Sequence, residues 1–129
     1  MKLSEKQQDF SSDVARFILY GECLGIRMTF GDAYRPWMLQ LLYYFGYEVK
    51  TIEGKLKLVK AKKVSWTMNS LHLSRLAVDF NFFIDGLLTY DKEKLQKLGD
   101  YWEGLRVGNK WGGNFPKDKI DTPHIQGSK

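Results

Sequence analysis

Two histidines, each with a carboxylate nearby, are the residues of this chain whose types and spacing point to chemistry. His72 is followed seven residues later by Asp79, and His124 is preceded three residues earlier by Asp121. Asp79 stands in an apolar segment, where an unpaired charge would be expensive to bury. A catalytic zinc typically takes three protein ligands from His, Asp and Glu and keeps one position for water. The sequence therefore predicts one metal site built from His72, Asp79 and His124, with Asp121 beside it as a proton acceptor.

Each of these residues also has a simpler interpretation. A single histidine in an apolar segment is more often a packed or surface residue than a ligand. Asp121 lies in the sequence DTPH, whose residues are common in turns. Only the combination of two histidines and two carboxylates favours a metal, and it suits zinc best without excluding other divalent ions.

The hydrophobic pattern divides the chain into elements that would position these residues. Helices are predicted over residues 3–23, 36–46 and 91–105. Strands are predicted over residues 25–34, 47–52, 55–59, 76–84, 87–90 and 123–126. The segment from Gly108 is rich in Gly, Pro and Asn, and we interpret it as an ordered loop that closes in the short strand carrying His124. The fold class expected is α+β: one small domain over residues 1–129, with an antiparallel sheet and flanking helices.

Composition limits the class of protein. The chain has 129 residues, 43% of them hydrophobic and 15% aromatic, which indicates a compact globular fold. No apolar run approaches the roughly 20 residues of a membrane span, so no stable membrane insertion is expected. The N-terminus lacks the apolar core of a signal peptide, which predicts synthesis in the cytoplasm without one. The single cysteine, Cys23, cannot form an internal disulfide and is expected to be buried in the first helix. We expect a monomer.

Positive charge gathers in one segment. The net charge is +5, and residues 48–63 carry six lysines. The simplest interpretation is a solvated hairpin with lysines on its open face. A basic surface also favours polyanionic surroundings such as nucleic acid or an acidic cell-wall polymer. Because arginine is scarce and no nucleic-acid-binding signature is present, no nucleic-acid partner is expected.

Several segments together resemble a known family. SLHLSRLAVD, residues 70–79, resembles the S-x-H-x-x-G-x-A-x-D signature of zinc D-alanyl-D-alanine carboxypeptidases and L-alanyl-D-glutamate endopeptidases, a group that includes phage endolysins and shares its fold with the hedgehog signalling domain. DTPH is similar to the second motif of the family, WGGNF to its W-G-G-[DN]-[WF] segment, and GDAYRP to its G-Y-R-S segment. These matches occur in the family order between Met28 and Gln126.

The resemblance assigns expected roles to the predicted site. It implies zinc bound by His72, Asp79 and His124, with Asp121 acting first as general base and then as general acid. It implies that Arg35 stabilises the oxyanion or holds a substrate carbonyl or carboxylate.

Further residues receive substrate-binding roles from the same resemblance. Ser70 would line the site and bind substrate or a ligand. Trp111 and Asn114 would contact substrate, although a packed aromatic and a turn residue are equally good interpretations. The sequence departs from the signature at Arg75, which stands where the family has glycine. Arg75 either follows an altered turn or reshapes a subsite to meet an acidic group of the peptide.

The function implied is hydrolysis of an amide bond in the peptide stems of peptidoglycan. The first choice is an L-alanyl-D-glutamate endopeptidase of phage or prophage endolysin type, acting on the cell wall or periplasm after release, through a holin in the case of a phage. The alternative within the family is a D-alanyl-D-alanine carboxypeptidase. Two other classes are a non-catalytic zinc-binding protein of the same fold and a small nucleic-acid binder, the latter resting only on the lysine-rich hairpin.

Overall fold

An antiparallel sheet of five strands forms the centre of the molecule. The structure is a computed structural model that describes residues 1–65 and 67–129. The strands run in the order β1-β4-β7-β6, and β5 pairs with the C-terminal half of β4. Their bounds are β1 (Ile26–Phe30), β4 (Ala77–Ile84), β5 (Leu87–Thr89), β6 (Lys110–Trp111) and β7 (His124–Gln126).

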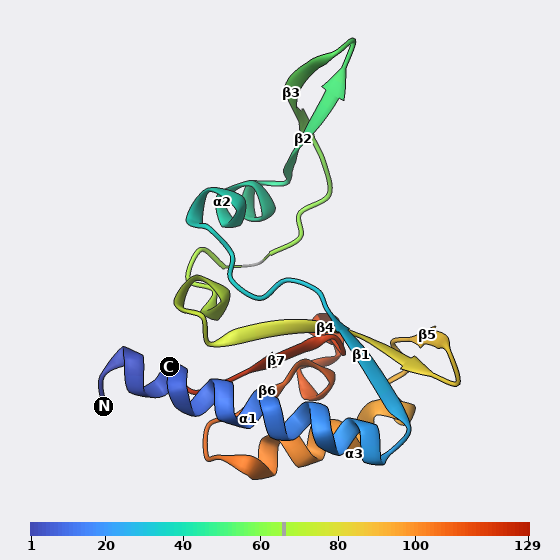
Figure 1. Ribbon diagram of the computed structural model, residues 1–129. Coiled ribbons are helices and arrows are strands. Elements are labelled where there is room, and N and C mark those ends of the chain that lie inside the picture. The colour runs from blue at the N-terminus through green and yellow to red at the C-terminus, as the bar shows by residue number, and fades with distance from the viewer. Residues whose placement is uncertain (66) are drawn as a thin grey trace.

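Two helices, α1 (Leu3–Cys23) and α3 (Lys92–Leu105), cover one face of this sheet (Figure 1). Phe17 in α1 packs against Phe80 and Phe82 of β4 and against Trp102 of α3. All four side chains are buried, so the hydrophobic core lies between the helices and the sheet. None of the helices in the described ranges is both long and apolar enough to cross a membrane.

Strand β4 has one face in the core and one face directed away from it. Val78, Phe80 and Phe82 are buried, and they alternate with the less buried Asp79 and Asn81. Successive side chains of a strand point to opposite faces of the sheet. Asp79 therefore leaves the sheet on the face opposite the core, although its neighbours in sequence are apolar.

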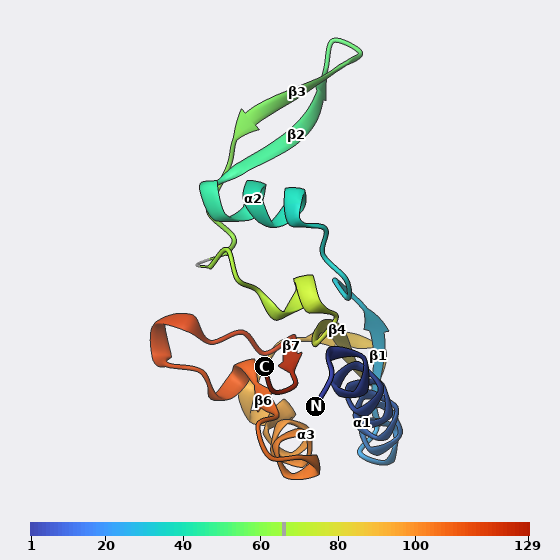
Figure 2. The same cartoon turned by 90° about the vertical axis from the view of Figure 1, so that its left-hand side faces the viewer.

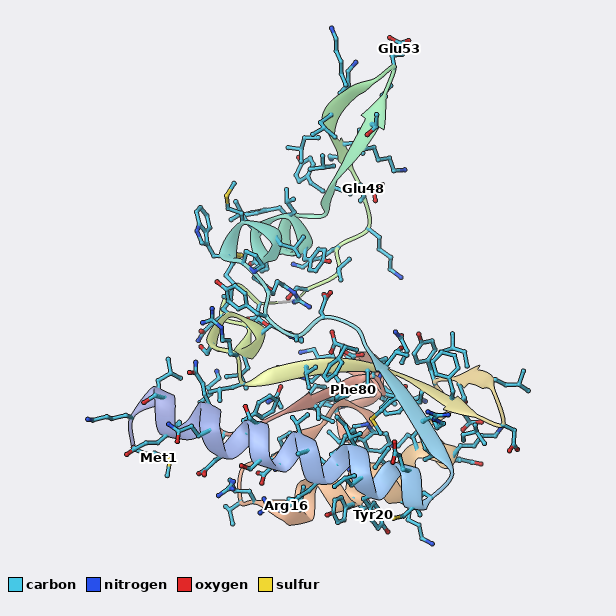
Figure 3. All side chains as sticks on the ribbon, in the orientation of Figure 1. Met1, Arg16, Tyr20, Glu48, Glu53 and Phe80 are labelled. Atoms are coloured by element: carbon cyan, nitrogen blue, oxygen red, sulfur yellow. The ribbon has the colours of Figure 1, made fainter. Side chains whose placement is uncertain are left out.

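An arm rises from that second face of the sheet (Figure 2). It consists of helix α2 (Trp37–Phe45) and the antiparallel hairpin of β2 (Tyr47–Ile52) and β3 (Lys55–Lys60). Glu53 lies at the outer end of the hairpin, far from Phe80 in the sheet (Figure 3). Glu53 and Gly54 have φ values of 52° and 76°, and two successive positive φ values are what a type I′ two-residue turn requires.

The predicted α+β class, antiparallel sheet and flanking helices are confirmed. The three helices and the expected hairpin lie within a residue or two of their predicted bounds. The first strand was predicted too long, because β1 ends at Phe30, and the short strand β6 was missed. The prediction that Cys23 is buried was wrong, since this residue is exposed. Cys23 lies two residues, about 200° of helical turn, beyond the buried Gly21 and so faces solvent.

Candidate metal centre

Asp79 and His124 meet across two paired strands. The register of β4 and β7 sets the two residues opposite each other, so their side chains leave the same face of the sheet. Asp79 Oδ1 lies 3.1 Å from His124 Nδ1. The backbone of Asp79 is held on its other side, where its carbonyl accepts the Gly31 N–H and its N–H donates to the Asp32 carbonyl, both at 2.7 Å.

His72 approaches the same carboxylate from the turn that precedes β4. It lies in the short 3-10 helix η1 (Leu71–Ser74), and the Ser70 hydroxyl accepts its backbone N–H at 3.3 Å. Its ring atom Nδ1 is 3.0 Å from the carbonyl oxygen of Ala33. A carbonyl only accepts hydrogen bonds, so Nδ1 carries a proton, and in the neutral ring Nε2 keeps a free lone pair. Nε2 lies 3.4 Å from Asp79 Oδ2.

His124 presents its other ring nitrogen to the cluster. Its Nε2 is 2.8 Å from Gln126 Oε1, which accepts the ring proton and leaves Nδ1 free to face Asp79. One donor atom from each of His72, Asp79 and His124 lies within 4.8 Å of the others. Donors around a tetrahedral zinc with bonds of about 2.0–2.1 Å stand roughly 3.3 Å apart. The two N···O separations, 3.1 Å to Oδ1 and 3.4 Å to Oδ2 of Asp79, are of this size, so the carboxylate lies between the two histidines as a zinc ligand would.

The protonation equilibria of the cluster favour an ionised carboxylate. Without a cation, a protonated histidine donates from the nitrogen that faces Asp79. Burial acts to raise the pKa of Asp79, but hydrogen bonds from His124 and His72, together with their charges, outweigh burial and hold that pKa well below its usual range. Burial opposes protonation of His124, yet the hydrogen bond to Asp79 raises the pKa of His124 above its ordinary value. Without a cation the three groups satisfy one another, and a bound cation would replace the histidine proton.

Asp121 stands beside the cluster at a backbone position that two glycines make possible. Its N–H donates to the Gly112 carbonyl at 2.9 Å, and its own carbonyl accepts the His124 N–H at 3.0 Å. A Cβ on Gly112 would lie 2.0 Å from the Asp121 carbonyl oxygen, so glycine is required there. Gly113 makes room for the ring of Trp111, which a Cβ would meet at 2.3 Å.

The carboxyl group of Asp121 is tuned toward accepting a proton. Much of the residue is exposed, but partial loss of hydration raises the pKa of the carboxyl, and the negative charge of Asp79 adds to this. The charges of His124, His72 and Arg35 act in the opposite direction, and the net pKa is raised. A carboxylate with a raised pKa is a better general base.

Arg35 is the cation of the site and is buried. Its Nη1 donates to Gln40 Oε1 at 2.8 Å, and its Nη2 donates to Asp32 Oδ2 at 3.2 Å. The same Nη2 lies 3.8 Å from Asp79 Oδ2, and the guanidinium carbon lies 4.8 Å from the centre of the Tyr43 ring. Nε of Arg35 is buried and has no hydrogen-bond partner within residues 1–65 and 67–129.

The chain is similar to known proteins in sequence and in fold. The peptidase M15 profile described as D-alanyl-D-alanine carboxypeptidase matches residues 63–127, half of the chain, including both histidines and both carboxylates. The chain belongs to the M15 peptidase family. The fold resembles the crystal structure of the Serratia marcescens L-Ala D-Glu endopeptidase ChiX, with a TM-score of 0.60 and 17% identity over 97% of this chain and 85% of that chain. No curated protein sequence matches the chain.

The remaining predicted residues, Ser70, Trp111 and Asn114, each have structural contacts of their own. Ser70 caps the turn that holds His72. Trp111 is 1% exposed, so it has no surface to offer a substrate, and it serves as a packed aromatic. Asn114 bonds to the side chains of Gln96 and Glu103. Burial thus favours the interpretation of Trp111 as a packed aromatic, whereas Asn114 is exposed and its contact with substrate stays a prediction.

The side chains of three further residues, none of them predicted from the sequence, hold the M15 cluster in place. Asp32 and Gln40 bind Arg35, and Gln126 orients His124. Gln126 had a usable signal, since it lies two residues after His124 on the same face of a predicted strand. Gln40 had a weaker one, as a polar residue inside the apolar sequence WMLQLLYYF.

Proposed function

We propose that this M15 peptidase is a zinc enzyme that hydrolyses an amide bond in the peptide stems of peptidoglycan, and specifically an L-alanyl-D-glutamate endopeptidase. The observation that carries the proposal is the convergence of three free donor atoms, from His72, Asp79 and His124, beside a carboxylate and a cation. A protein that only stored zinc would have little need of Asp121 or Arg35.

Each residue has a defined task in this proposal. Bound zinc would supply a Lewis acid that polarises the scissile carbonyl and makes water acidic near neutral pH. Asp121 accepts a proton from the attacking water and later donates it to the departing amine nitrogen. Arg35 carries positive charge next to the cluster, with Nη2 3.8 Å from Asp79 Oδ2, and this charge stabilises the oxygen that gains negative charge. Gln126 and the Ala33 carbonyl keep each histidine in the tautomer that binds a cation.

Substitution of the proton acceptor tests the mechanism. We expect Asp121→Ala to bind zinc as the parent does and to lose hydrolysis by about 10²-fold or more, because proton transfer is removed while the three donors stay in place. His72→Ala should lose both zinc and hydrolysis. Asp118→Ala is the matched control, since it removes an exposed carboxylate of the same loop. Hydrolysis by Asp121→Ala at the parental rate would rule out the mechanism.

The bond cleaved is tested separately. Support for the endopeptidase comes from the likeness to ChiX, which extends over almost the whole chain. The family description favours a second candidate, the D-alanyl-D-alanine carboxypeptidase. Purified stem peptides digested with the zinc-loaded protein and analysed by mass spectrometry should show cleavage between L-alanine and D-glutamate. Release of terminal D-alanine alone would replace the first candidate by the second.

We further propose that the protein acts as a monomer on the cell wall after release from the cytoplasm, in the manner of a phage or prophage endolysin. The net charge of +5 supports this setting, because a basic protein is attracted to an anionic wall. Lysis of cells expressing the protein only when a membrane-permeabilising holin is co-expressed would be the expected result. Lysis without permeabilisation would contradict the release step.

A further inference from the structure

Arg75 occupies a backbone conformation that favours glycine. It ends η1 with φ 56° and ψ 35°, in the left-handed region, where a side chain is strained. Glu53 and Asp85, the other described non-glycine residues with positive φ, each begin the turn of a β-hairpin. Glycine would fit the Arg75 turn without strain, so the turn alone does not explain the arginine. Strain that a glycine would relieve is typical of functional positions.

The side chain of Arg75 is held in place while its hydrogen-bond donors stay free. Its guanidinium carbon lies 4.1 Å from the centre of the Tyr34 ring, a stacking distance. Stacking on an aromatic face restrains the planar group but engages none of its N–H donors. Arg75 is exposed and makes no side-chain hydrogen bond or ion pair with any residue that the structure describes. Arg35 differs, because two of its nitrogens are already bonded to Gln40 and Asp32.

The backbone of Arg75 and the backbone next to Tyr34 both bond to one carbonyl group of the candidate metal centre. The carbonyl oxygen of His72 accepts the backbone N–H of Arg75 and also that of Arg35, both at 3.3 Å. Tyr34 lies between Arg35 and Ala33, the residue whose carbonyl orients the His72 ring. Both members of the stack are therefore attached to the backbone that surrounds a proposed zinc ligand.

We propose that Arg75, stacked on Tyr34, binds a substrate carboxylate next to the scissile amide. The inference rests on the proposed function and deepens it. In both candidate bonds the residue that provides the amide nitrogen carries a free carboxylate. D-glutamate is joined to the next residue of the stem through its side chain, so its α-carboxylate is free. In the second candidate bond the free carboxylate is the terminal one of D-alanine. A guanidinium with free, parallel N–H donors can bind such a carboxylate through two hydrogen bonds, one to each oxygen. Arg75 thereby selects stem peptides whose carboxylate is not amidated.

The test uses Arg75→Gly, a variant that the backbone conformation suits, so loss of folding is not expected. Two pairs of stem peptides serve as probes, one with D-glutamate as the α-carboxylate or α-amide, the other with terminal D-alanine as the acid or amide. Binding to the hydrolysis-deficient Asp121→Ala protein, loaded with zinc, is measured by calorimetry with and without Arg75→Gly. We expect Arg75→Gly to weaken binding of one free-acid peptide about 10-fold and to leave its amide unchanged. The pair that responds identifies which carboxylate is bound.

The same variant is then assayed for hydrolysis in the parental background. Arg75→Gly should raise KM for the responsive acid about 10-fold with little change in kcat, and Lys57→Ala, which removes an exposed charge from the hairpin, should change neither. Equal effects on acid and amide, or no effect on either, would overturn the inference. Absence of hydrolysis by the parent, with acid-selective binding that depends on Arg75, would refute the proposed function and leave the carboxylate site standing.

Discussion

Gln40 is the residue that connects the site cation to the arm. Its side chain is 0% exposed, and every polar atom is used. Oε1 accepts from Arg35, while Nε2 donates to the Ser65 hydroxyl at 2.6 Å and to the Thr67 carbonyl. These hydrogen bonds fix the orientation of the Gln40 amide, and the amide in turn holds the Nη1 group of Arg35. Gln40 touches neither the donor atoms nor, in our proposal, the substrate, so it acts as a positioning residue for Arg35.

Replacing Gln40 by leucine should separate positioning from metal binding. We expect Gln40→Leu to lower kcat by roughly 10- to 100-fold, because small displacements of a catalytic group have effects of that order. Zinc content, measured on the purified protein, should stay at the parental level, since all three donors come from other segments. Leu41→Ala, a change at the next residue of α2, serves as control. A change in zinc content equal to the loss of activity would assign Gln40 a structural role instead.

At the scale of elements, α3 and the loop carrying Asp121 are joined by one aromatic ring. Trp111 lies against Gly99 of α3, where an added Cβ would come within 2.1 Å of the ring. Its indole N–H donates to the Thr122 carbonyl at 2.9 Å, and its backbone N–H donates to Glu103 at 3.0 Å. The packed Trp111 ring thus sets the distance between α3 and residues 122–124, the segment that carries His124.

Two glycines of α3 offer a matched pair of substitutions. Gly99→Ala should destabilise the protein by about 1–3 kcal/mol, because the new methyl group overlaps the Trp111 ring. Gly104→Ala should stabilise it by up to about 1 kcal/mol, since nothing lies within 4 Å of its added Cβ and alanine favours the helix. Urea unfolding of both variants measures the difference. Shifts of the same sign would contradict the contact between Gly99 and Trp111.

At the scale of the whole molecule, the two faces of the central sheet have different roles. One face packs against α1 and α3, and the arm lies on the side of the other face (Figure 1). The side chains of the candidate metal centre leave the sheet on that second face. The donors come from η1, β4 and β7 and are held by the segment of residues 31–35. Such a set exists only in the folded chain, so binding of a metal by these donors would be coupled to folding.

This coupling predicts the effect of metal removal. At a free zinc concentration 100 times the dissociation constant, we expect an increase of about 2.7 kcal/mol in the free energy of unfolding. Thermal unfolding with zinc, and with a chelator in excess, measures the shift. His72→Ala should abolish the zinc-dependent part, and Asp118→Ala should retain it. A melting temperature that is the same with zinc and with chelator would argue against the site.

Local patterns were sufficient for most of the fold. The period of apolar residues and the cap at Asp91, whose carboxylate accepts the Glu93 N–H at 2.9 Å, located the helices. The apolar run of residues 76–84 located the central strand. The two-residue strand β6 escaped prediction, because it exists only through pairing with β7 and has no pattern of its own.

The sequence by itself determined the types of the candidate donors, since a carboxylate and two histidines in family motifs were visible without coordinates. Tertiary structure decided which atoms of His72 and His124 face Asp79. The tautomer of His72 is selected by the carbonyl of Ala33, which is distant in the chain, and that of His124 by the side chain of Gln126. Tertiary structure also decided that Trp111 is packing, since its neighbour Gly99 lies on another element. Hydrogen-bond partners far apart in the chain leave no local pattern, whereas residue types and periods do.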